Sequence, residues 1–130
     1  MSRDLDDRTE VAEFVVRFYR EIAQDERFHY YFETLAGVDW NAHTRDLTDF
    51  WAGLLFGEPH PEADVVIESH RWLHETTGFD ASLFEQWLEV FETVLDDGWS
   101  GPVAEQARRR ANGYAWAMAK RLVGVDLRKS

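Results

Sequence analysis

Two histidines, His43 and His74, lie where they can face each other across one apolar pocket. His43 begins the apolar stripe of one expected helix, and His74 comes just before a second, aromatic-rich helix. The stripes are formed by Leu47, Phe50, Trp51 and Leu54 in the first helix and by Phe84, Trp87, Leu88 and Phe91 in the second. Histidines in such places either find a hydrogen-bond partner within a core or flank the iron of a flat cofactor.

Further hydrogen-bond donors fall on apolar stripes. Tyr19 lies on the inward stripe of the first expected helix, and both its hydroxyl and the indole N–H of Trp87 need partners when buried. Each residue alone also fits an ordinary aromatic core. Together, Tyr19, His43 and Trp87 would supply O–H and N–H donors from three helices, while a neutral imidazole on the other side would coordinate iron.

Other metal sites fit the sequence less well. His70 and His74 have the HxxxH spacing of a zinc pair, but Arg71 stands where a zinc hydrolase of the HExxH type needs glutamate. No third zinc ligand stands nearby. A carboxylate-bridged di-iron bundle would need two ExxH motifs, and only Glu26-x-x-His29 has that spacing.

The periodicity that must position these residues is helical throughout. It predicts four longer and two shorter helices, each with one apolar face, and therefore an all-α fold. They cover Thr9 to Gln24, Glu26 to Leu35, a helix capped by Asp39 and ended by Gly57, Asp64 to about Glu75, a helix capped by Asp80 or Ser82 that runs to about Asp96, and Val103 to Val123.

Composition limits the function classes. The 130 residues are expected to form a single domain, 1–130, with its core at about 10–122 and short flexible termini. A net charge of −11 disfavours nucleic acid and anionic membrane surfaces. The chain has no cysteine, which excludes disulfides, thiolate metal sites and haem attachment through a CxxCH motif. With no spanning segment or signal pattern, a cytoplasmic location is expected.

At these residues the chain resembles the truncated (2-over-2) globins, most closely their third group. Tyr19 lies thirteen residues before Phe32, the separation between that family's distal tyrosine and the phenylalanine on the haem edge. Trp40-x-x-His43 and the run from Phe50 to Glu58 are similar to the distal-helix signature. The proximal pattern is matched by His74, Phe79, Asp80, Phe84 and Trp87-Leu88-x-x-Phe91.

The resemblance implies a globin-like 2-over-2 sandwich that holds haem b without covalent attachment. His74 is then the axial iron ligand and His70 the alternative, because the segment from Glu58 to His74 is a few residues longer than usual in the family. The other implied site residues are Tyr19, His43 and Trp87 facing the diatomic ligand, Phe32, Leu47, Trp51 and Phe79 lining the pocket, and Arg71 or Arg45 pairing with a haem propionate.

The implied function is binding of O2, NO or CO at haem iron. A donor-rich pocket suits slow release, and hence sensing, scavenging or redox chemistry, more than oxygen transport or storage. NO dioxygenation or peroxide reduction would need electrons from a separate reductase. A monomer or weak dimer is expected. The alternative is a cofactor-free, globin-like helical module that binds a partner protein through its acidic face.

Overall fold

The computed structural model describes residues 3–34 and 39–128, apart from the side chains of residues 32–34 and 40. The described chain is helical and contains no β-strand, which confirms the all-α prediction. None of its helices is both long and apolar enough to cross a membrane. The elements are α1 (Arg8–Gln24), α2 (Glu26–Thr34), α3 (Trp40–Phe56), α4 (Ala63–Ser69), α5 (Arg71–Thr77), α6 (Ala81–Gly98), α7 (Pro102–Met118) and the π-helical turn η1 (Ala119–Val123).

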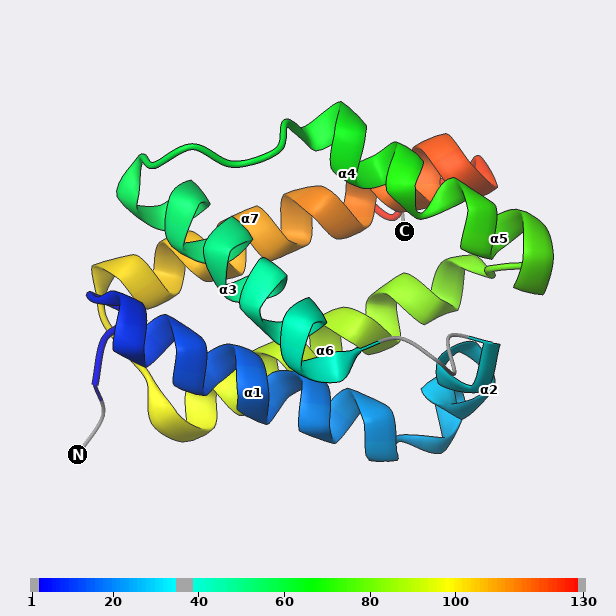
Figure 1. Ribbon diagram of the computed structural model, residues 1–130. Coiled ribbons are helices and arrows are strands. Elements are labelled where there is room, and N and C mark those ends of the chain that lie inside the picture. The colour runs from blue at the N-terminus through cyan, green and yellow to red at the C-terminus, as the bar shows by residue number, and fades with distance from the viewer. Residues whose placement is uncertain (1–2, 35–38, 129–130) are drawn as a thin grey trace.

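Four long helices form the body of the molecule. Helix α1 packs against both α3 and α6, and α6 packs against α7 along its length (Figure 1). The short helices α4 and α5 lie at one end, where α4 contacts α7 and α5 contacts α2. This arrangement places α3 and α6 both against α1 and puts His70 and His74 in the α4–α5 segment at one end.

Helix ends follow the expected capping chemistry. Asp39 accepts hydrogen bonds from the backbone N–H groups of the first turn of α3 at 3.0 and 3.2 Å, and Gly57 ends that helix in the left-handed region with φ of 72°. Asp80 caps α6 by accepting from the Ser82 N–H at 2.7 Å. Of the two predicted caps for α6, Asp80 is therefore the one used.

The segment expected as one helix from Asp64 to Glu75 is two helices. The break falls at His70, which ends α4 and precedes α5 with φ −90° and ψ −11°. Its backbone N–H donates to the Ile67 carbonyl at 3.1 Å, three residues back, so the chain tightens there before the next helix starts. The prediction of a continuous helix was wrong at this residue.

The buried apolar side chains form two clusters. The larger one lies between α1, α3, α6 and α7 and contains Phe14, Phe18 and Phe91; the smaller one surrounds Phe79 and Phe84 near α4 and η1. Three side chains of α6 pack against both clusters: Leu83, Trp87 and Leu88. Trp87 is thus positioned by both halves of the core.

The residues before α1 tie down the start of α7. Leu5 and Trp99 are each about 1% exposed, and the Asp4 carboxylate accepts hydrogen bonds from the Val103 and Ala104 N–H groups at 3.2 and 2.7 Å. The N-cap residue of α7, Gly101, has no side chain that could satisfy these donors. A carboxylate about a hundred residues earlier in the chain therefore performs that role.

Gly53 is required where the loop after α3 folds back. A Cβ at this position would lie 2.8 Å from the Pro59 carbonyl oxygen and 2.9 Å from the His60 Cβ. Gly53→Ala is therefore expected to lower the free energy of unfolding by about 1–3 kcal/mol in urea titrations. Gly113→Ala is the control, because no atom lies within 4 Å of its would-be Cβ. It should be neutral or stabilising by up to about 1 kcal/mol, and an equal loss in both variants would contradict the argument.

Candidate functional site

Three polar aromatic side chains from three helices converge. Tyr19 of α1 and His43 of α3 have ring centroids 6.4 Å apart, and the indole N–H of Trp87 on α6 donates a hydrogen bond to the Tyr19 hydroxyl. The buried ring of Phe18 lies against both neighbours, with centroids 4.8 Å from Tyr19 and 5.3 Å from Trp87. Phe18 was not singled out in the sequence, although its place on the apolar stripe of α1 put it next to Tyr19.

The Tyr19 hydroxyl is held neutral and oriented. Burial raises the pKa of this phenol well above its usual value near 10, and the hydrogen bond from Trp87 opposes that rise only in part. Because the indole N–H donates to the phenol oxygen, the hydroxyl hydrogen of Tyr19 points away from Trp87. The pair therefore presents one oriented O–H donor.

His43 is half-buried and favours its neutral form. Burial is the main cause that lowers the pKa of this imidazole; the nearby Asp46 carboxylate opposes the shift and His70 adds to it. The influence of His70 means that this ring of the α4–α5 segment lies within electrostatic reach of His43. The charges of the two rings are thus close enough to influence each other.

The lowered pKa of His43 predicts that the protein becomes less stable at acid pH. Above pH 6.5, the ordinary value for histidine, the ring is neutral in both folded and unfolded chains; below it the unfolded chain takes up a proton that the folded one resists. The free energy of unfolding should therefore fall as the pH drops through 6.5. His43→Gln should make that decline shallower in urea titrations across this range, and an unchanged pH dependence would contradict the proposed burial effect.

The two histidines of the α4–α5 segment differ in their hydrogen bonds. The Nδ1 atom of His70 lies 2.8 Å from the Val66 carbonyl oxygen, which can only accept, so Nδ1 carries the proton. The Nδ1 atom of His74 instead accepts the Phe79 N–H at 2.9 Å. In the neutral rings, His70 therefore has an unprotonated Nε2, whereas the proton of His74 is on Nε2. Of these two rings, His70 is the one whose tautomer offers Nε2 to a metal.

The expected pocket lining is only partly described. Trp51 is buried, with its ring centroid 5.4 Å from that of Phe91, and Leu47 is half-buried beside it in the larger cluster. Phe79 is buried, 5.3 Å from the His74 ring. The side chain of Phe32 lies outside the described residues.

The two candidate cations for a haem propionate differ in their partners. Arg71 forms an ion pair with Glu68, in which its Nε lies 2.6 Å from a carboxylate oxygen. Arg45 is exposed on α3. In the described part of the chain no three histidine or carboxylate side chains gather into a metal-binding group.

The chain is similar to known proteins in sequence and in fold, although no family model matches it. It is 27% identical over 89 residues to a group 3 truncated hemoglobin of Campylobacter jejuni, a match that covers 66% of this chain and 67% of that protein. The crystal structure of a group III truncated hemoglobin from the same organism superposes with a TM-score of 0.80 at 24% identity, covering 94% of this chain and 95% of the other.

The fold is that of a truncated globin. The resemblance to the third group of truncated haemoglobins is confirmed as well, since the curated relative and the structural neighbour both carry that description. In this truncated-globin fold, Tyr19, His43 and Trp87 sit on the helix pairs that form the sandwich, and both candidate ligand histidines lie in the connecting α4–α5 segment.

Proposed function

We propose that this chain binds haem b non-covalently and uses it to bind O2 and related diatomic molecules. The observation that carries the proposal is the convergence of Tyr19, His43 and Trp87 beside a histidine-bearing segment whose His70 interacts electrostatically with His43. Similarity to two truncated haemoglobins supports it. Non-covalent binding follows from the absence of cysteine.

For the axial ligand, two lines of reasoning favour different residues. Sequence spacing to Trp87 favours His74, whereas hydrogen bonding favours His70, whose Nδ1 donates to the Val66 carbonyl and whose Nε2 lone pair is therefore available. Binding through His74 would require its ring to give up the Phe79 N–H or to lose its Nε2 proton. We therefore propose His70 as the ligand, with His74 as the alternative.

Haem would supply an iron centre with an open position for a small diatomic ligand. The chain's own residues then determine how slowly that diatomic ligand dissociates. Tyr19 would offer its oriented hydroxyl hydrogen, Trp87 would keep the hydroxyl from turning away, and neutral His43 would add an N–H donor or an acceptor according to its tautomer. The apolar ring of Trp51 would help to exclude water.

Slow release is the behaviour that such a donor set supports. A hydrogen bond to a partly charged guest contributes on the order of 1.5–3 kcal/mol, so each donor delays dissociation. We propose sensing, scavenging or redox turnover, such as NO dioxygenation or peroxide reduction, in preference to oxygen delivery. Turnover of either kind would draw electrons from a separate reductase.

Haem reconstitution tests the proposal. Purified protein is titrated with ferric haem, and the absorbance spectrum is followed in the ferric, ferrous and CO-bound states. A stoichiometric complex with a sharpened Soret band, which shifts on CO addition, is expected. A spectrum that remains that of free haem at every ratio would contradict haem binding. The cofactor-free helical module that binds a partner protein would then be the remaining hypothesis.

A further inference from the structure

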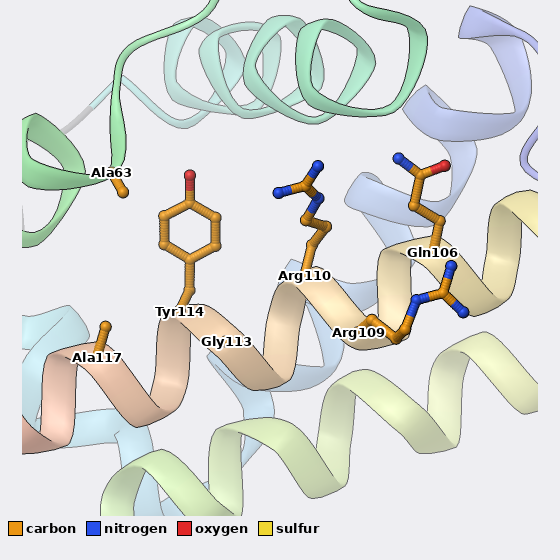
Figure 2. A pocket seen from close by; sticks show the side chains of 7 residues that line it. All are labelled: Ala63, Gln106, Arg109, Arg110, Gly113, Tyr114 and Ala117. Atoms are coloured by element: carbon orange, nitrogen blue, oxygen red, sulfur yellow. The ribbon is translucent and has the colours of Figure 1, made fainter.

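A cleft along α7, bounded by the start of α4, lies apart from the site described above. Its volume is about 520 Å³, within the range of small-molecule pockets. Small residues make room for it: Ala63 at the start of α4 and Gly113 and Ala117 on α7 (Figure 2). None of Tyr19, His43, His70, His74 or Trp87 lines this cleft.

The cleft is lined by two arginines without carboxylate partners, a property that they share among the described residues with Arg20, Arg45 and Lys120. Arg108 contacts Glu92, Asp96 and Glu105 through its guanidinium group. The next two residues, Arg109 and Arg110, form no ion pair within the described residues, and both line the cleft. Elsewhere in the described chain, ion pairs are formed by Arg3, Arg8, Arg17, Arg27, Arg71, Arg121 and Arg128.

This lack of partners is unexpected in so acidic a chain. Aspartate and glutamate number 25 against 14 lysines and arginines, so carboxylates are in excess over cations. Two neighbouring arginines without a carboxylate partner therefore leave positive charge on this stretch of α7, and Figure 2 shows their side chains leaving the helix in different directions. Guanidinium groups bind carboxylates and phosphates through paired, parallel hydrogen bonds.

Polar groups of the cleft share one face of α7. Gln106, Arg110 and Tyr114 follow one another at intervals of four residues, and Figure 2 shows their side chains extending from α7 on the same side. The Arg110 charge lowers the pKa of the Tyr114 phenol against the larger, raising effect of burial, which places the two groups close together. Tyr114 also packs on Phe50 of α3, with ring centroids 5.6 Å apart, and this contact helps to hold the Tyr114 ring in place.

We propose that this cleft binds a small organic anion, a carboxylate or phosphate monoester with a short apolar part. Arg109 and Arg110 hold the anionic group, and the Gln106 amide and Tyr114 hydroxyl add hydrogen bonds. The apolar part packs over Gly113 and Ala117. The proposal does not depend on haem binding, because no residue is shared between the two sites.

A second surface cleft, between α1 and α6, lacks this character. It is lined by Arg17 and Arg20 but also by Glu21, Glu89, Asp96 and Asp97, and Arg17 is paired with Asp97. Its carboxylates outnumber its arginines, so the cleft is net negative and an anion would meet repulsion there.

Calorimetric titration with four probes tests the proposal: benzoate, phenyl phosphate, inorganic phosphate and the neutral benzyl alcohol. We expect saturable binding of benzoate or phenyl phosphate with a dissociation constant on the order of 0.1–1 mM, and which of the two binds more tightly identifies the anionic group. Inorganic phosphate should bind more weakly and benzyl alcohol not measurably. The amide resonance of Gly113 should shift in NMR spectra on binding.

Matched variants locate the site. Arg109→Gln/Arg110→Gln should weaken binding at least about ten-fold, equivalent to about 1.4 kcal/mol, and Tyr114→Phe should weaken it less. Arg20→Gln/Lys120→Gln removes the same net charge elsewhere and should leave the dissociation constant within about two-fold. Circular dichroism checks that each variant is folded. Absence of saturable binding by every anion, or equal losses in both double variants, would overturn the proposal.

Discussion

We expect His70→Ala to abolish the Soret band of the haem-reconstituted protein and His74→Ala to retain it. This is the largest effect expected of any single substitution. The reason is chemical, since His70 donates from Nδ1 to the Val66 carbonyl and leaves Nε2 available, while His74 has its Nδ1 engaged by the Phe79 N–H. Loss of the only axial nitrogen should lower haem affinity by more than about 100-fold, the upper end of what second-shell partners cost.

Added imidazole distinguishes a lost ligand from a damaged fold. It should restore the Soret band of the unsubstituted protein in His70→Ala by occupying the space that the side chain left. His74→Ala should cost about 1 kcal/mol of stability, because the Phe79 N–H loses its acceptor, with little effect on the spectrum. The reverse outcome, with loss of the band in His74→Ala alone, would return the axial role to His74 and show that its hydrogen bond breaks when haem binds.

Tyr19→Phe speeds O2 dissociation from the ferrous protein by about 10- to 150-fold, as expected for loss of one hydrogen bond of about 1.5–3 kcal/mol. Trp87→Phe should speed it by a smaller factor, because the indole orients the Tyr19 hydroxyl. Stopped-flow replacement of O2 by CO measures both rates. Phenylalanine keeps an aromatic ring against Phe18 in both variants, and against Phe91 in Trp87→Phe.

The double variant provides the control for this network. If Trp87 acts through the Tyr19 hydroxyl, Trp87→Phe should have little further effect once Tyr19 is phenylalanine, so the two effects should not add. Full additivity would mean that Trp87 donates to the guest independently. Unchanged rates in both single variants would remove the Tyr19–Trp87 pair from the function altogether.

Much of the fold was predictable because its signals are local. Asp39 before α3, Gly57 after it and Asp80 before α6 are residues whose side chain, or lack of one, suits a helix end, and the structure uses each in that way. The break at His70 was not predictable in the same way. No glycine or proline marks it, and the change of helix axis depends on how α4 packs against α7 and α5 against α2.

The candidate site was predictable in its residue types but not in its hydrogen bonds. The apolar stripes put Tyr19, His43 and Trp87 on inward faces, from which their meeting could be expected. Spacing along the chain cannot tell which ring nitrogen carries a proton, and this is what separates His70 from His74. That distinction arises from two backbone groups, the Val66 carbonyl and the Phe79 N–H, whose directions follow from the fold.

The link between Asp4 and the start of α7 has a further consequence. Its hydrogen bonds join positions 99 and 100 residues apart, so they cannot form until almost the whole chain has been synthesised. The first turn of α7 therefore depends on a long-range contact for the partners of its N–H groups. Removing the first few residues, Asp4 among them, would take away this acceptor and destabilise the start of the helix that bears Arg109 and Arg110. The N-terminal segment therefore contributes to the stability of a surface that lies about a hundred residues later in the sequence.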